Sequence, residues 1–358
     1  MNATRIAVGG AAPYPVVVGT GVLGELPSLV GAVRTVVVIH PEGLEAIARP
    51  VCGVLAGAGY LVHAEPVPPG EAAKQIAVAA GLWSRLAAHG VTRSDAVVGV
   101  GGGATTDLAG FVAATWLRGV RLVLVPTTLL AIADAAVGGK TAVNTPEGKT
   151  RGGVFHAPAG VLADLAVLES LAASEYVSGL AEVVKAGFVA DPVILDLIEA
   201  DPAGAVVPHG QHTRELVERA VRMKADVVTG DMREAGRREI LNYGHTLGHA
   251  IERVEGYRIR HGEAVSIGMV FAAELATLAG RLDAATVHRH RAILAGVGLP
   301  TTYLAGAWPA LRDSMAVDKK ARGAALRFVV LDGLANPAIL ADPAEELLAR
   351  AYAEVTSR

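Results

Sequence analysis

Short β-branched runs alternate with alanine- and leucine-rich segments over the first half of the chain, and this alternation constrains the fold most strongly. The runs at residues 14–18, 35–39, 96–100 and 121–125 predict strands, and residues 71–89 carry apolar side chains at helical spacing. Strands that alternate with helices are typical of a parallel sheet flanked by helices. We therefore predict an α/β architecture for this half.

The pattern changes near residue 172. Amphipathic segments at residues 173–186, 192–200, 213–228, 239–254, 263–279 and 284–294 predict helices, and strand-like runs nearly vanish until residues 326–331. A chain of 358 residues has room for about two domains. We expect an α/β domain over residues 1–172 and a mostly α-helical domain over residues 173–358.

Composition excludes several classes of protein. Apolar residues make up 52% of the chain and charged residues 19%, which excludes a disordered chain. A net charge of −3 provides no broad basic surface for nucleic acid. The most apolar stretch, residues 120–139, is interrupted by Arg121, Pro126 and Asp134, so no membrane span is expected. The single Cys52 and the poor match of the N-terminus to a signal peptide favour a reducing, cytoplasmic setting.

A glycine turn follows the predicted strand at residues 96–100. Gly101, Gly102 and Gly103 stand between this strand and a helical segment at residues 108–117. Such a turn presents backbone N–H groups to a phosphate or pyrophosphate. The acidic residue that usually follows about 20 residues later to bind a ribose is absent, which disfavours a plain Rossmann dehydrogenase. A tight structural turn is the alternative interpretation.

The most chemically informative segment is residues 238–261. Four polar side chains at positions i, i+4, i+7 and i+11 predict one face of a single helix: Arg238, Asn242, His245 and His249. Two histidines one turn apart can bind one metal ion, so spacing alone suggests His245 and His249. Interleaved glycines at 244 and 248 predict a close approach of another backbone.

Two more residues are candidates for the same metal. His261 begins the next predicted helix and could supply another imidazole. Glu182 lies in an otherwise apolar helix and has Lys185 three residues later, so both side chains should point the same way. A set of two histidines and one glutamate would leave zinc an open position for substrate. Single lysines and arginines also occur within apolar or glycine-rich segments, where their side chains could bind anions.

Together these motifs resemble the 3-dehydroquinate synthase family of the sugar-phosphate cyclase superfamily, with actinobacterial forms most similar. The resemblance runs nearly end to end and is densest in VGVGGGATTDLAGFVAATWLRGV, VPTTLLAIADAAVGGKTAVNT, SGLAEVVKAGF, LNYGHTLGHAIE, HGEAVSIGM and DKK. It implies a Rossmann-like NAD-binding domain followed by a helical metal- and substrate-binding domain. The implied activity, in the shikimate pathway, is cyclisation of 3-deoxy-D-arabino-heptulosonate 7-phosphate to 3-dehydroquinate with release of phosphate.

The resemblance also implies roles for individual residues. The implied ligands of a divalent metal, which is zinc or cobalt, are Glu182, His245 and His261. His249 would then face the substrate instead. The implied NAD-binding residues are Glu71, Lys74, Gly101, Gly102, Gly103, Asp107, Thr127 and Thr128. The implied catalytic residues are Lys140, Lys185, Lys224, Glu234, Arg238, Asn242 and His249. Further substrate contacts would come from Asp134, Lys149, Thr150, Lys319 and Arg118, the last reaching the neighbouring active site of a homodimer.

One departure keeps other functions open. Where the family usually has Gly-Lys-Asn, this chain has Gly148, Lys149 and Thr150, followed by Arg151. Thr150 lacks the amide donor of asparagine, so an aminodehydroquinate synthase that uses the amino analogue of the substrate in secondary metabolism is an alternative. A metal-dependent polyol dehydrogenase is a weaker one, since it would not need the set of lysines.

Overall fold

The computed structural model describes residues 3–146, 148–322 and 325–356, with no side chains described at 317–322. The chain divides into two compact units. The first contains residues up to Leu171 together with Lys224–Arg233, and the second contains Ala172–Met223 and Glu234 onward. The segment 224–233 thus groups with the first unit, although it lies beyond the boundary predicted at residue 172.

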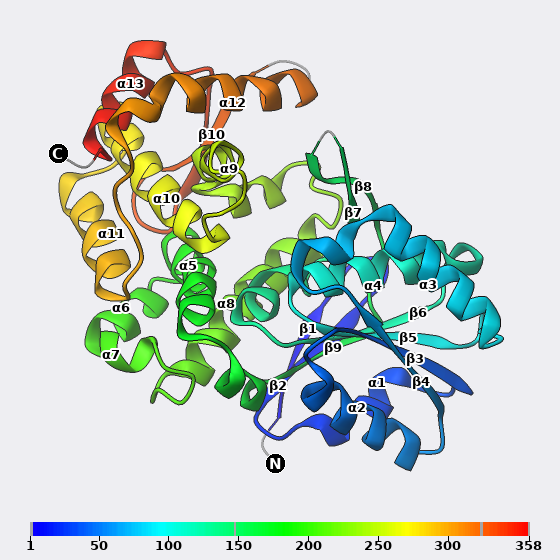
Figure 1. Ribbon diagram of the computed structural model, residues 1–358. Helices are drawn as coiled ribbons and strands as arrows, with labels where there is room; N and C mark the ends of the chain where they lie inside the picture. Colours follow the sequence, from blue (N-terminus) through cyan, green and yellow to red (C-terminus); the bar gives the residue numbers. More distant parts are fainter. Residues whose placement is uncertain (1–2, 147, 323–324, 357–358) are drawn as a thin grey trace. The chain divides into compact units, whose positions relative to one another are not determined.

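The first unit is built on a mostly parallel sheet (Figure 1). Its strand order is β1-β2-β9-β6-β5-β3-β4, and β1 is antiparallel to β2 whereas the other pairs are parallel. The strands are β1 (Thr4–Val8), β2 (Tyr14–Gly19), β3 (Thr35–Pro41), β4 (Leu61–Val67), β5 (Ala96–Gly101), β6 (Arg121–Pro126) and β9 (Gly160–Asp164). The central strands are mostly apolar because both faces of the sheet are covered.

Helices cover the two faces of this sheet. Figure 1 shows α1 (Leu26–Val30) and α2 (Glu45–Gly57) on one side, and α3 (Ile76–Ala88) and α4 (Gly103–Thr115) on the other. Val17, Val36, Leu55, Val98 and Leu162 belong to one buried core. A separate hairpin pairs β7 (Lys140–Thr145) with β8 (Gly148–Phe155).

The second unit is mostly helical. Its helices are α5 (Ala173–Val189), α6 (Val193–Ala200), α7 (Pro202–Ala205), most of α8 (Thr213–Gly230), α9 (His245–Val254), α10 (His261–Leu278), α11 (Ala284–Gly296), α12 (Trp308–Arg322) and α13 (Glu345–Glu354). Helix α10 is buried on nearly all sides because α5, α9, α11 and α13 pack around it. A two-stranded sheet pairs β10 (Arg327–Leu331) with β11 (Pro337–Ala341).

The predicted α/β half and helical half are confirmed, and two predicted helices are wrong in detail. Residues 71–89 form a short 3-10 turn, η2 (Gly70–Lys74), and then α3, because Gln75 between them is extended. Residues 239–254 form a 3-10 turn, η6 (Arg237–Asn242), and then α9. The break occurs at Gly244, whose φ of +79° is left-handed. Among the described residues, no helix is long and apolar enough to cross a membrane.

Candidate functional site

Three helices of the second unit bring a carboxylate and two imidazoles together. Glu182 comes from the middle of α5, and His245 and His261 are the first residues of α9 and α10. Oε1 of Glu182 lies 3.6 Å from Nε2 of His245 and 3.7 Å from Nε2 of His261. In a tetrahedral zinc site with bonds of about 2.0–2.1 Å, neighbouring donor atoms lie about 3.4 Å apart. The three side chains therefore form a candidate metal site.

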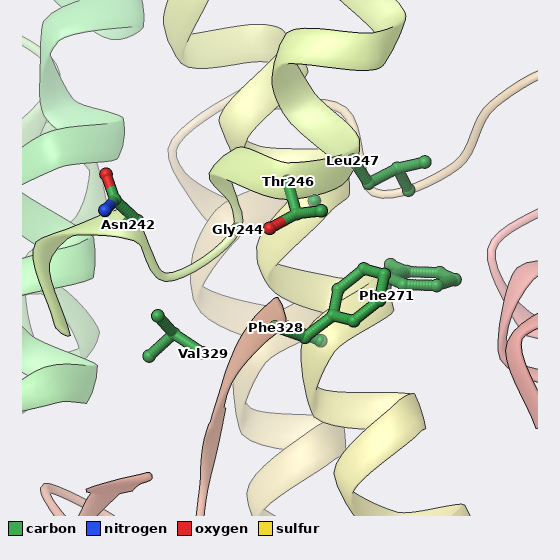
Figure 2. Close-up of a pocket in the computed structure, with 9 residues that line it drawn as sticks. Asn242, Gly244, Thr246, Leu247, Phe271, Phe328 and Val329 are labelled. Atoms are coloured by element: carbon green, nitrogen blue, oxygen red, sulfur yellow. The ribbon is translucent and has the colours of Figure 1, made fainter. Parts of the chain in front are cut away.

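Glycines allow these helices to approach backbone to backbone. A Cβ added to Gly262 of α10 would lie 1.8 Å from the carbonyl oxygen of Ser178 in α5, and one added to Gly268 would lie 1.9 Å from that of Gly244. A Cβ on Gly248 would also approach the α10 backbone, at 3.2 Å. The predicted close approach at 244 and 248 is confirmed. Figure 2 shows Gly244, directly before α9, and Thr246 in the first turn of α9 against α10.

The electrostatics of the cluster suit a cation. Lys185 pairs with Oε2 of Glu182, which leaves Oε1 on the side of the two histidines. Burial and the nearby Lys185 lower the pKa of His245, so its imidazole is neutral, as a ligand must be. Burial opposes the charged form of His261, but Glu182 and Glu252 together raise its pKa to about 10. Without a metal, His261 therefore holds a proton close to these two carboxylates. A bound cation would take the place of that proton.

The predicted helical stripe of four polar residues is wrong because the chain bends between η6 and α9. Arg238 and Asn242 lie on η6, before the left-handed Gly244, whereas His245 and His249 lie on α9. Arg238 is buried. The Asn242 amide donates to Oε1 of Glu234 over 2.9 Å. Figure 2 shows Asn242 pointing away from Phe271 of α10 and Phe328 of β10.

His249 groups with two other residues. Its candidate cluster contains Glu252 and His261, whereas His245 clusters with Glu182 and His261. Glu252 is buried, and Oε2 of Glu252 lies 3.4 Å from Nδ1 of His261. Sequence analysis did not single out Glu252. The sequence feature that could have identified Glu252 is its position three residues after His249, which places both on the same side of the amphipathic helix α9.

In the first unit the glycine turn lies at the point where the strand order reverses. Strand β5 pairs with β3 on one side and β6 on the other, and β4 lies beyond β3. In open α/β sheets, ligands bind outside the carboxyl ends of the strands at such a reversal. Helix α4 begins at Gly103, directly after β5, and Thr127 donates its backbone N–H to Gly101 over 3.0 Å. Thr128 follows in the same turn.

The glycines are needed for close packing in this turn. A Cβ on Gly101 would meet Thr105 of α4 at 2.7 Å, and one on Gly102 would meet the Thr128 side chain at 3.2 Å. Because the turn also opens a helix of 13 residues, its N–H groups and the helix dipole favour an anion. These are the features that a pyrophosphate-binding turn requires.

Polar side chains of the first unit gather near this turn. Lys74 is buried and pairs with Asp107 over 2.6 Å. Burial raises the pKa of Asp107, and Lys74 opposes that rise. Glu71 accepts from the Asn144 amide over 2.7 Å and lies 3.7 Å from the ammonium of Lys149. Asn144 is a contact that sequence analysis did not identify.

The other predicted site residues of the first unit include one partly buried ion pair and several exposed groups. Lys224 is buried and pairs with Asp134 over 2.5 Å. Lys140 is exposed at the start of β7. Thr150 is exposed with a φ of +56°, and its N–H donates to Asn144 Oδ1 over 3.0 Å. Arg118 is exposed, with a φ of +69°. The predicted Lys319 side chain lies outside the described residues.

Comparisons with known proteins agree over most of the chain. The family model of the 3-dehydroquinate synthase N-terminal domain matches residues 65–178, and that of the C-terminal domain matches residues 179–321. A 3-dehydroquinate synthase from Thermobifida fusca is 67% identical over 99% of this chain and 97% of that protein. One from Streptomyces avermitilis is 60% identical, with 98% of each protein covered.

Solved structures share the fold of this chain at lower sequence identity. A 2-deoxy-scyllo-inosose synthase complexed with carbaglucose-6-phosphate, NAD+ and Co2+ is 27% identical, with a TM-score of 0.89 over 99% of this chain and 100% of that one. A 2-epi-5-epi-valiolone synthase from Streptomyces hygroscopicus, with NAD+ and Zn2+ bound, is 27% identical, with a TM-score of 0.88 over 96% of each chain. A probable glycerol dehydrogenase from Sinorhizobium meliloti, at 18% identity and a TM-score of 0.66 over 94% of each chain, shares the fold alone. From its motifs, its fold and these relatives, the chain belongs to the 3-dehydroquinate synthase family.

Proposed function

We propose that this chain converts 3-deoxy-D-arabino-heptulosonate 7-phosphate to 3-dehydroquinate with release of phosphate, using NAD and a divalent metal. The observation that carries the proposal is the cluster of buried Glu182 and His245 with partly buried His261, in a chain 67% identical to a named 3-dehydroquinate synthase. The reaction belongs to the shikimate pathway and to aromatic amino acid biosynthesis. The single Cys52, free of any disulfide, supports a cytoplasmic site of action.

Glu182, His245 and His261 would hold the metal, zinc or cobalt. A set of one carboxylate oxygen and two imidazole nitrogens suits either ion and leaves room for substrate oxygens. When bound, the metal supplies Lewis-acid polarisation of a substrate oxygen. Lys185 holds Oε2 of Glu182, so that Oε1 is directed to the histidines. In this proposal NAD binds to residues 1–172, the metal binds to residues 173–358, and substrate contacts come mainly from the latter.

The glycine turn would hold the pyrophosphate of NAD, which supplies a hydride acceptor that is regenerated in the same cycle. Gly101, Gly102 and Gly103 let the dinucleotide approach the start of α4. Thr127 and Thr128 border the turn, and the ion pair of Lys74 with Asp107 adds fixed polar groups beside it. Glu71 would be the remaining residue of the proposed NAD-binding set.

The remaining residues would bind and orient the two anionic ends of the substrate. Cations suited to carboxylate and phosphate are Lys140, Lys149, Lys185, Lys224, Arg238 and Lys319. Asp134 fixes the ammonium of Lys224, and Glu234 fixes the amide of Asn242. His249, exposed on α9, would carry a proton between substrate and solvent. The shape of the site would thus hold the flexible sugar in a reactive conformation.

A homodimer completes the proposal. Leu117 and Arg118 are consecutive non-glycine residues with left-handed backbone, at φ values of 48° and 69°. Leu117 is also 41% exposed, which is high for a large apolar side chain. Strained and exposed backbone of this kind is concentrated at functional surfaces. Arg118 would reach the active site of the neighbouring subunit.

The amino-substrate alternative rests only on Thr150 and Arg151, and the relatives named 3-dehydroquinate synthase do not favour it. A polyol dehydrogenase shares the fold but would accumulate NADH. Thr150→Asn would separate the first of these alternatives, because it should shift preference toward the oxygen substrate only if Thr150 selects the amino analogue.

The test is phosphate release from 3-deoxy-D-arabino-heptulosonate 7-phosphate with zinc and NAD. We expect release that EDTA abolishes and zinc restores, with no net NADH. Arg238→Ala should lower kcat/KM by at least about 100-fold with zinc content retained, because a fixed cation would be lost. The exposed neighbour Arg237 provides a matched control, and Arg237→Ala should retain activity. Net NADH, or release that persists without metal, would contradict the proposal.

A further inference from the structure

His261 belongs to two clusters at once, and its two ring nitrogens divide between them. Nε2 lies 3.7 Å from Oε1 of Glu182, the side that also holds His245. Nδ1 lies 3.4 Å from Oε2 of Glu252, the side that also holds His249. The second cluster could therefore be a second metal site, or it could be part of the support of the first.

The chemistry of imidazole decides between these possibilities. A neutral imidazole that binds a metal through Nε2 carries its hydrogen on Nδ1 and must donate it. Binding of a second metal at Nδ1 would require a doubly deprotonated ring. Glu252 is buried and stands 3.4 Å from Nδ1, where an acceptor is needed. The second cluster thus has the composition expected of a hydrogen-bonded carboxylate behind a metal ligand.

We propose that Glu252 is a positioning residue, which holds His261 with Nε2 directed at the metal and makes that nitrogen a stronger donor. The inference rests on the proposed metal site and adds a residue to it. Helix α9 then contributes twice, because His245 at its first position is a ligand and Glu252 near its end orients the other histidine. The same helix therefore couples two of the three donors.

The two histidines are supported in different ways. Nδ1 of His245 lies 3.1 Å from the carbonyl oxygen of Tyr243 and donates to it, so its acceptor is neutral. Nδ1 of His261 faces a carboxylate, which is a stronger acceptor. Removing the charge of Glu252 should therefore weaken metal binding through His261 while leaving the orientation of His245 unchanged.

The experiment compares zinc binding by the full chain and by Glu252→Gln, which preserves shape and removes the charge. Zinc affinity is measured by competition with a chromophoric chelator, and zinc per chain by elemental analysis. We expect one zinc per chain in both proteins and about 10- to 100-fold weaker binding in the variant. The absorption bands of the Co2+-substituted protein should also shift, which a loss of general stability would not cause.

Two further variants complete the design. Glu255→Gln removes a carboxylate that pairs with Tyr303 and Arg258 at the end of α9, so affinity should remain at the wild-type value. Glu182→Gln should abolish tight binding. Unchanged affinity and spectrum in Glu252→Gln, or two metals per wild-type chain with one lost in the variant, would overturn the role of Glu252. Wild-type affinity in Glu182→Gln would overturn the proposed ligand set instead.

Discussion

At the scale of single residues, His290 is a buried histidine whose surroundings require it to stay neutral. Its ring stacks on Phe188 at a centroid distance of 3.5 Å. Nδ1 donates to the carbonyl of Thr286 over 2.7 Å, so Nε2 has no hydrogen and accepts from the hydroxyl of Tyr243 over 2.8 Å. Burial lowers the pKa of His290 to about 4. His290 therefore stabilises the chain segment before His245 only in its neutral form.

This predicts a loss of stability in mild acid. The pKa of His290 is about 4 when folded and about 6.5 when unfolded, so the unfolded chain binds the extra proton as the pH falls below 6.5. The contribution of His290 is fully present above pH 6.5 and falls between pH 6.5 and 4. Between pH 7.5 and 5 the free energy of unfolding should drop by about 2 kcal/mol from this group. Denaturant unfolding of the metal-free protein measures it.

Two variants isolate the effect. His290→Gln should lower stability at pH 7.5 and flatten its dependence on pH. His288→Gln, two residues away on the exposed side of α11, should preserve the wild-type dependence. An equal slope in wild type and His290→Gln would show that other groups cause the acid loss.

At the scale of elements, the metal ligands depend on glycine contacts between helices. The Cβ of an alanine at 268 would overlap the carbonyl oxygen of Gly244, which is backbone and cannot rotate away. We expect Gly268→Ala to lower the free energy of unfolding by at least about 3 kcal/mol and to weaken zinc binding, because α9 must move off α10. Thermal unfolding and chelator competition measure both quantities.

Gly296 is the matched control for this prediction. It lies in α11 of the same unit, and a Cβ there would meet no atom within 4 Å. Gly296→Ala should leave zinc affinity unchanged and stability equal or up to about 1 kcal/mol higher, since alanine favours helix. Equal behaviour of the two variants would mean that the contact between α9 and α10 does not position His245.

The same elements show how far sequence can predict this structure. The buried strands β3, β5 and β6 each contain a short run rich in valine, isoleucine or leucine, so a local pattern was sufficient to predict them. Strand β4 was missed because it is largely exposed and carries Glu65 and Pro66. The break at Gly244 was missed because contact with Met269 and Val265 of α10 sets the conformation there, which periodicity along one helix cannot reveal.

The candidate site divides in a similar way. Glu182 and Lys185 could be paired from their spacing on one helix, and the structure confirms this pairing. The choice of His261 over His249 as the second imidazole came from family resemblance. Spacing favoured His245 with His249, whereas the structure places His245 in a candidate cluster with Glu182 and His261. Asn144 contacts Glu71, 73 residues earlier, so no local pattern marked it. The place of Glu252 three residues after His249 was a local signal, but it did not reveal the contact with His261 at the start of the next helix.

At the scale of the whole molecule, the chain returns to its first unit after entering the second. Lys224 pairs with Asp134, 90 residues earlier, and the N–H of Gly9 donates to the Thr229 hydroxyl over 2.7 Å. These contacts hold residues 224–233 within the first unit. The first unit is therefore formed by two separate stretches of the chain, and the proposed NAD turn and metal site belong to different units.

This division predicts that the two proposed cofactors protect different parts of the chain. Each should stabilise the unit that binds it, by about 2.7 kcal/mol at 100 times its dissociation constant. In hydrogen exchange followed by mass spectrometry, zinc alone should slow exchange most in α5, α9 and α10. NAD alone should slow it most between β5 and α4 and around Thr127. Zinc protection confined to the glycine turn would contradict the ligand set, and the Glu182→Gln variant, which should lose the zinc effect and retain that of NAD, provides the control.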